Sequence, residues 1–102
     1  MRLARIIGNV TLNRMLSDFP AGSFQIVEVL DAQALTGLDT HARRKSPMPE
    51  SLVALDQLGA GVGQIIGVSE GREATMPFWP RRVPVDSYVC AILDQVDYDA
   101  QA

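Results

Sequence analysis

Hydrophobic and polar residues alternate along several short stretches of the chain, which is the period of a half-buried β-strand. In residues 2–12, for example, Ala4 and Ile6 fall on one face and Arg5 and Asn9 on the other. Further strands rich in β-branched and aromatic residues are predicted at residues 23–31, 52–56, 64–69 and 87–98. The pattern predicts an all-β domain, either a small barrel or a sandwich.

The connections between these strands carry turn signals. Residues 32–50 show no period and are expected to form an exposed loop. Residues 71–76 leave room for about one helical turn before Pro77, which disfavours helical geometry in the residue before it. The proline-containing residues 77–84 are expected to be extended.

Three of the predicted strands carry apolar residues on both faces. In residues 23–31, Phe24 and Ile26 have one parity and Val27 and Val29 the other. A small barrel or sandwich covers only one face of each strand with its own core, so the second face lies under a loop or under another chain. The number of such strands favours another chain, and we expect an obligate oligomer.

A run of glycines, Gly59, Gly61 and Gly63, lies between two of the predicted strands. The run lacks the Gly-x-Gly-x-x-Gly spacing of a dinucleotide site, and no Walker lysine follows it. We interpret it as a turn whose glycines allow positive φ and close backbone approach, in a hairpin or against a neighbouring subunit.

Composition narrows the possible functions. A chain of 102 residues has room for one domain, which we assign to residues 1–102. Its formal charge of −3 argues against binding to nucleic acid or an anionic membrane, and no apolar run is long enough to span a bilayer. The single cysteine, Cys90, is expected to be a small buried hydrophobe and fits a reducing cytoplasm.

Candidate chemical residues give no convincing site, and we predict no catalytic residue, cofactor or metal. His41, the only histidine, lies among loop signals, as does the basic cluster at residues 43–45. The aspartates stand mostly at strand ends, where they usually accept hydrogen bonds from nearby backbone N–H groups. Trp79 is expected to anchor a subunit contact or to cap the core.

The chain resembles the bacterial microcompartment vertex proteins, the pentameric family that includes the carboxysome corner protein and the ethanolamine-utilisation shell protein. The resemblance rests on residues 1–10, on the glycine run with the strand after it, and on residues 84–94. Gln64 stands where the family commonly has a glutamate, and residues 36–50 and 78–79 match no family feature.

The resemblance implies a small closed β-barrel of the oligonucleotide-binding type, with about five strands and one short helical turn. It also implies a homopentamer that closes the vertices of a polyhedral shell in the cytoplasm, beside hexameric shell proteins. On this basis we expect Gly59, Gly61 and Gly63 to allow close packing in the ring, and Pro84 and Asp86 to fix the start of the last strand.

Two other classes of protein remain compatible with the sequence. A barrel that binds oligonucleotides would share the all-β pattern, although it usually has a basic groove with several exposed aromatics. A small enzyme would need His41 and a carboxylate across a subunit boundary.

Overall fold

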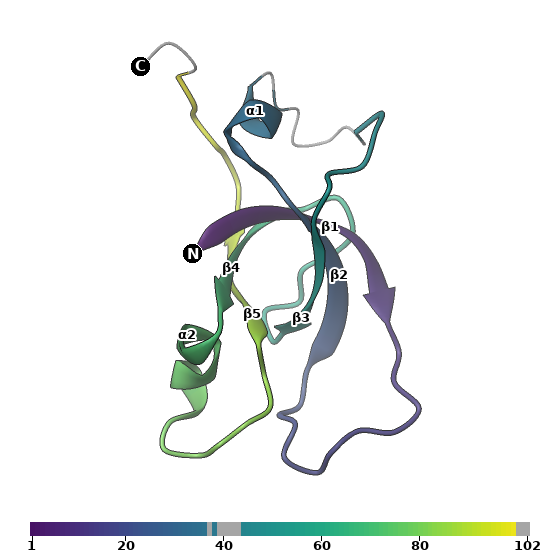
Figure 1. The fold of residues 1–102 in the computed structure, drawn as a ribbon, viewed down its shortest axis with the longest axis vertical. Helices are drawn as coiled ribbons and strands as arrows, with labels where there is room; N and C mark the ends of the chain where they lie inside the picture. The colour runs from purple at the N-terminus through teal and green to yellow at the C-terminus, as the bar shows by residue number, and fades with distance from the viewer. Residues whose placement is uncertain (37, 39–43, 100–102) are drawn as a thin grey trace.

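The computed structural model describes residues 1–36, 38 and 44–99. Five strands form a closed barrel in the order β1-β2-β3-β5-β4, with β4 pairing back to β1 (Figure 1). The strands are β1 (Arg2–Val10), β2 (Ser23–Val29), β3 (Ser51–Asp56), β4 (Ile65–Glu70) and β5 (Ser87–Leu93). The predicted all-β closed barrel of about five strands is confirmed.

The pairing between neighbouring strands is antiparallel except at one seam. There β3 and β5 run parallel, and their ladder consists of the single pair Leu55 and Tyr88. In the strand order, this seam lies on the opposite side of the barrel from β1. Parallel strands are joined by crossover connections, and this one contains the glycine run, β4 and a short helical segment.

The interior of the barrel is filled by inward-facing aliphatic residues, because successive side chains of a strand point to opposite faces. The buried cluster consists of Ala4, Ile6, Val27, Ala54, Ala60, Ile66, Val68 and Val89. Ala60 belongs to the glycine run, so this connection contributes to the core.

Two further clusters lie outside the barrel, where connections cover outward-facing apolar residues. One surrounds Leu30, Ala34 and Ile65, beneath α1 (Ala32–Leu35). The other surrounds Leu55, Ala74 and Val85, beside α2 (Arg72–Thr75). The protein's own loops therefore cover part of the second apolar face that we expected another chain to cover.

Several predicted boundaries were wrong. Residues 32–50 contain the helix α1, which begins after Asp31, whose carboxylate accepts a hydrogen bond from Ala34 N at 2.8 Å. The helical turn predicted within residues 71–76 is confirmed as α2, but the 3-10 helix η1 (Met76–Phe78) follows it directly, so Pro77 and Phe78 are helical rather than extended. The last strand ends at Leu93 rather than Tyr98, since Val96 packs into the cluster beneath α1 instead of pairing.

Candidate assembly surfaces

The glycine run is held against the barrel by hydrogen bonds to a buried polar pair, Gln25 and Asp56. The Asp56 carboxylate accepts hydrogen bonds from Leu58 N and Ala60 N, both at 2.8 Å. Gln25, which faces into the barrel, donates to Asp56 at 3.2 Å and to the Ala60 carbonyl at 3.0 Å. Buried polar groups are costly unless paired, so these bonds fix the path of the run. The expectation that aspartates at strand ends bond backbone donors is confirmed for Asp56 and Asp31.

The far end of the run is fastened to β1. Gly63 N donates to the Ile6 carbonyl at 2.8 Å, and Ile6 N donates to the Gln64 carbonyl at 3.0 Å. The guanidinium of the buried Arg5 donates to the Gly63 carbonyl at 3.1 Å. The run thus crosses from the end of β3 to β1. The hairpin alternative was wrong, because β3 and β4 are not neighbours in the barrel.

The three glycines differ in what they require. Gly59 has a φ of 84° and Gly63 a φ of 94°, in the left-handed region that side chains rarely adopt. Gly61 has no positive φ, and a Cβ there would meet only the Gln64 side-chain oxygen, at 3.9 Å. That oxygen accepts a hydrogen bond from Gly61 N at 2.7 Å. In the isolated chain, Gly61 is therefore the glycine that a larger residue could replace without strain.

Apolar side chains remain exposed beside the end of the run. Val62 is 60% exposed, and Ile7, on the neighbouring part of β1, is 42% exposed. We call this pair the β1 face. In the strand order, β1 lies opposite the seam between β3 and β5.

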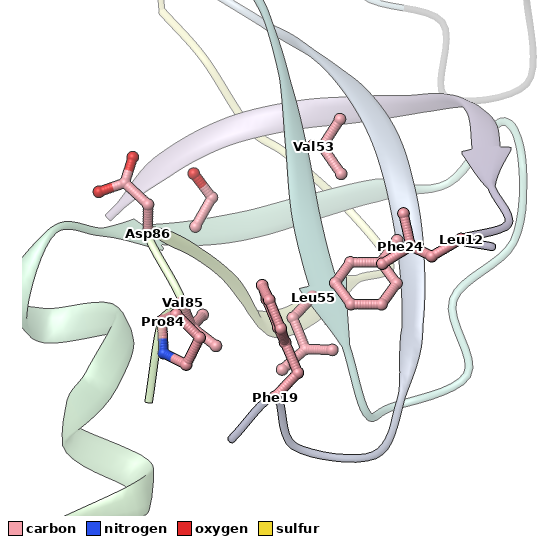
Figure 2. A pocket seen from close by; sticks show the side chains of 9 residues that line it. Leu12, Phe19, Phe24, Val53, Leu55, Pro84, Val85 and Asp86 are labelled. Carbon is pink, nitrogen blue, oxygen red and sulfur yellow. The ribbon is translucent and has the colours of Figure 1, made fainter. Parts of the chain in front are cut away.

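A second exposed apolar surface lies at the seam itself. Val53 on β3 is 51% exposed, and beside it opens a cavity of about 260 Å³. Figure 2 shows Pro84 and Val85 on one side of this cavity and Phe24 and Leu12 on the other, with Phe19 and Leu55 between them. We call Val53 and this cavity the seam face.

The predicted residues Pro84 and Asp86 both line the cavity and precede β5. The Asp86 carbonyl accepts a hydrogen bond from Gly71 N at 2.8 Å, which joins the approach to β5 to the start of α2. The glycine run and these two residues lie at different places on the barrel, so the predicted residues do not form one site.

Cys90 was predicted to be buried and is exposed. Its Sγ donates to the Gly67 carbonyl at 3.3 Å. Trp79 does not cap the core of a single chain, since it is 71% exposed. His41 and Arg43 lie outside the described residues. Within the described part of the chain, no cluster of three His, Cys, Asp or Glu residues could hold a metal ion, and the helices are too short to cross a membrane.

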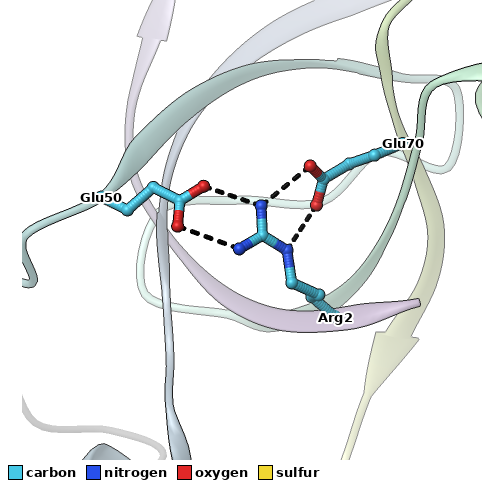
Figure 3. A network of polar contacts seen from close by, with 3 residues as sticks. All are labelled: Arg2, Glu50 and Glu70. Carbon is cyan, nitrogen blue, oxygen red and sulfur yellow. Dashed lines mark hydrogen bonds and ion pairs between the residues drawn. The ribbon is translucent and has the colours of Figure 1, made fainter.

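The Arg2 guanidinium pairs with the carboxylates of Glu50 and Glu70, and we call this group of three residues the fork. The sequence did not reveal it, because the three residues belong to segments distant from one another in the chain. The Arg2 guanidinium donates to both carboxylate oxygens of Glu50, at 2.9 and 2.8 Å, and to both of Glu70, at 2.6 and 2.8 Å (Figure 3). Hydrogen bonding to Arg2 lowers the pKa of the exposed Glu50 carboxyl. Bidentate arginine pairs fix geometry, so the fork holds the start of β1 against the start of β3 and the end of β4.

The fold and its exposed surfaces define a class: a small closed β-barrel with unpartnered apolar faces on two opposite sides. A sequence profile of the family described as ethanolamine utilisation protein EutN/carboxysome matches residues 1–94. The chain belongs to this family.

Individual relatives agree with that assignment. The carboxysome shell vertex protein CcmL of Gloeobacter violaceus is 25% identical over 99 residues, which are 97% of this chain and 88% of the relative. A pentameric shell protein from the RMM microcompartment is 29% identical, with a TM-score of 0.69 over 91% of this chain and 100% of that one. The ethanolamine utilisation protein EutN of Escherichia coli is 26% identical, with a TM-score of 0.73 over 96% of this chain and 89% of that one.

Proposed function

We propose that five copies of this chain form a closed ring that occupies the vertices of a bacterial microcompartment shell. Family membership supports the shell role, and the similarity to a pentameric shell protein supports the number of copies. The observation that carries the ring is the pair of apolar faces on opposite sides of one barrel. A cyclic ring needs such an arrangement, since one surface of each subunit meets a different surface of the next.

In this ring the seam face of one copy packs against the β1 face of its neighbour. Val53 and the adjacent cavity would be covered by Ile7 and Val62 of the next copy. Stable contacts bury roughly 1,200–2,000 Å² in total, with an apolar centre and a polar rim. Gly61 would permit close approach next to Val62, while Pro84 and Asp86 hold the start of β5 beside the cavity.

The function of such a ring is geometric. A sheet of hexameric shell proteins stays flat unless units with five-fold symmetry introduce curvature at its corners. We propose that this protein supplies those corners, contacts hexameric shell proteins through its rim, and resides in a shell in the cytoplasm. The role requires no catalytic residue, cofactor, nucleic acid or membrane.

The native mass of the purified protein tests the ring. We expect about five times the 11.1 kDa of one chain. Val53→Asp and Ile7→Asp each place a charge at one proposed face and should give folded, smaller species. Gln33→Glu, at an exposed position of α1 outside both faces, is the matched control and should retain the ring. A stable monomer or dimer of the wild-type protein at micromolar concentration would refute the proposal.

A further inference from the structure

The connection between β1 and β2, residues 11–22, exposes large apolar side chains in a single chain, and we call it the β1–β2 loop. Leu12 is 37% exposed, Met15 is 58% exposed and Leu16 is 65% exposed. The loop contains one arginine and one aspartate, so it offers no net charge to a charged partner. Apolar side chains that gather on a surface mark a contact with another molecule.

The β1–β2 loop is held in a defined shape, although it extends beyond the ends of both strands (Figure 1). The Phe19 ring packs edge-to-face on Phe24, with centroids 5.8 Å apart. Phe19 N donates to the Leu16 carbonyl at 3.1 Å, and the Gln57 side chain donates to the Ala21 carbonyl at 2.8 Å. The exposed apolar side chains are therefore presented on a fixed backbone.

The apolar surface of the β1–β2 loop is continuous with the seam face. Leu12 and Phe19 line the cavity of the seam face (Figure 2). The same two residues, together with Met15 and Leu16, line a second cavity of about 420 Å³. Leu12 and Met15 also line a third cavity, of about 460 Å³, with residues of β1 and β2. A subunit that covers the seam cavity therefore lies beside these side chains.

A ring needs more contact surface than the seam face and the β1 face supply. A standard contact takes about 800 Å² from each partner, and each subunit of a ring makes two such contacts. The total accessible surface of one chain is 6887 Å², so roughly a quarter of it would be covered. Val53, Ile7 and Val62 account for only a small part of that area. The β1–β2 loop is apolar surface that adjoins the seam face and could supply more of it.

We propose that the β1–β2 loop of one copy packs on the neighbouring copy in the ring, beside the contact between the seam face and the β1 face. Met15 and Leu16 become buried in this contact. The inference rests on the proposed ring, in which each seam face has one neighbour to cover it. It assigns the loop to the contact between subunits rather than to the surface that meets hexameric shell proteins.

Oxidation by hydrogen peroxide tests whether a neighbour covers the loop. Met15 and Met76 are similarly exposed in a single chain, at 58% and 50%, and Met76 lines none of the three cavities. Peroxide converts exposed methionine to its sulfoxide. In wild-type rings Met15 should be oxidised several-fold more slowly than Met76, whereas in dissociated chains the two rates should be similar. Mass spectrometry of proteolytic peptides gives both rates.

Polar substitutions test the energy of the same contact. Met15→Gln and Leu16→Asn change side chains that are more than half exposed in a single chain. Each loses the gain from burying that exposed part, so the dissociation constant of each subunit contact should rise about 5- to 20-fold. Met76→Gln is the matched control and should leave the ring unchanged. The free energy of unfolding of the dissociated chain should change little in all three variants, because the substituted side chains are exposed.

The outcomes separate this inference from the proposed function. Rings in which Met15 and Met76 are oxidised equally fast would overturn the loop contact and leave the pentamer standing. So would rings of both loop variants that dissociate at the wild-type concentration. Variants that form normal rings but no longer assemble with hexameric shell proteins would also overturn it, since the loop would then face those proteins. A wild-type protein that forms no ring would refute the proposed function.

Discussion

Replacing Gly61 by alanine tests whether the glycine run lies at a close contact between subunits. In the isolated chain a Cβ at this position meets one atom, the Gln64 side-chain oxygen at 3.9 Å, and the backbone has no positive φ. Such a substitution costs no strain and reduces the freedom of the unfolded chain, so it should stabilise the fold by about 0.4–1 kcal/mol.

In the ring the same methyl group would enter a packed contact. Overpacking costs about 1–3 kcal/mol, so each subunit contact of Gly61→Ala should weaken about 5- to 150-fold. The variant should thus combine a slightly more stable chain with a weaker ring. Only assembly makes the urea midpoint depend on protein concentration, so unfolding at several concentrations separates the two effects.

Gly59→Ala is the matched control. Its surroundings are equally open, but its φ of 84° strains any side chain, so it should destabilise the chain itself by about 1–2 kcal/mol. A Gly61→Ala protein whose ring dissociates at the wild-type concentration would refute the close contact. So would one that loses chain stability as Gly59→Ala does.

Three further predictions concern the fold and the shell. Asp56→Ala removes the acceptor of the buried Ala60 N–H and of one of the two side-chain hydrogen bonds that Gln25 donates. It should lower the free energy of unfolding by roughly 2–4 kcal/mol in urea titrations. A loss smaller than that from an alanine substitution at an exposed aspartate would contradict this account. Because Arg2 lowers the pKa of Glu50, the fork should stabilise the protein above the ordinary glutamate pKa and lose its effect as the pH falls through the lowered value. Wild type and Glu50→Gln should therefore differ in urea midpoint at neutral pH and converge in acid, whereas a constant difference would show that charge is not the cause. Deleting the gene in its host should give elongated or leaky shells with active enzymes in extracts, and normal closed shells in a host without a second copy would count against the vertex role.

Most of the strand positions could be predicted from the sequence, because inward and outward residues of a strand alternate and this period of two is visible in the order of apolar and polar residues. The buried pair of Gln25 and Asp56 was not predicted. Its only signal is a polar residue at an inward position of β2, which gains meaning once Ala60 is placed across the barrel. The fork at Arg2 and the cavity at the seam were missed for a similar reason, since each joins segments distant in the sequence.

The coverage of the second apolar face shows another limit of sequence patterns. Apolar residues of both parities correctly indicated two buried faces for some strands. They did not distinguish a face covered by a loop from one left open, because Ile65 and Val53 have similar hydrophobicity. Ile65 is buried beneath α1, whereas Val53 remains exposed. The difference depends on where the helix α1 packs, and loop signals obscured that helix.

The hydrogen bonding of the glycine run has a consequence for the energetics of assembly. The amides of Leu58, Ala60, Gly61 and Gly63 all donate within the chain, so the run holds its shape before any neighbour arrives. Fixing the backbone of a flexible residue costs about 1–2 kcal/mol, and a ring would repeat that cost at every contact. A preorganised run lowers this entropic cost at each of the five contacts of the proposed ring. A loop rich in glycine thus serves as a rigid surface.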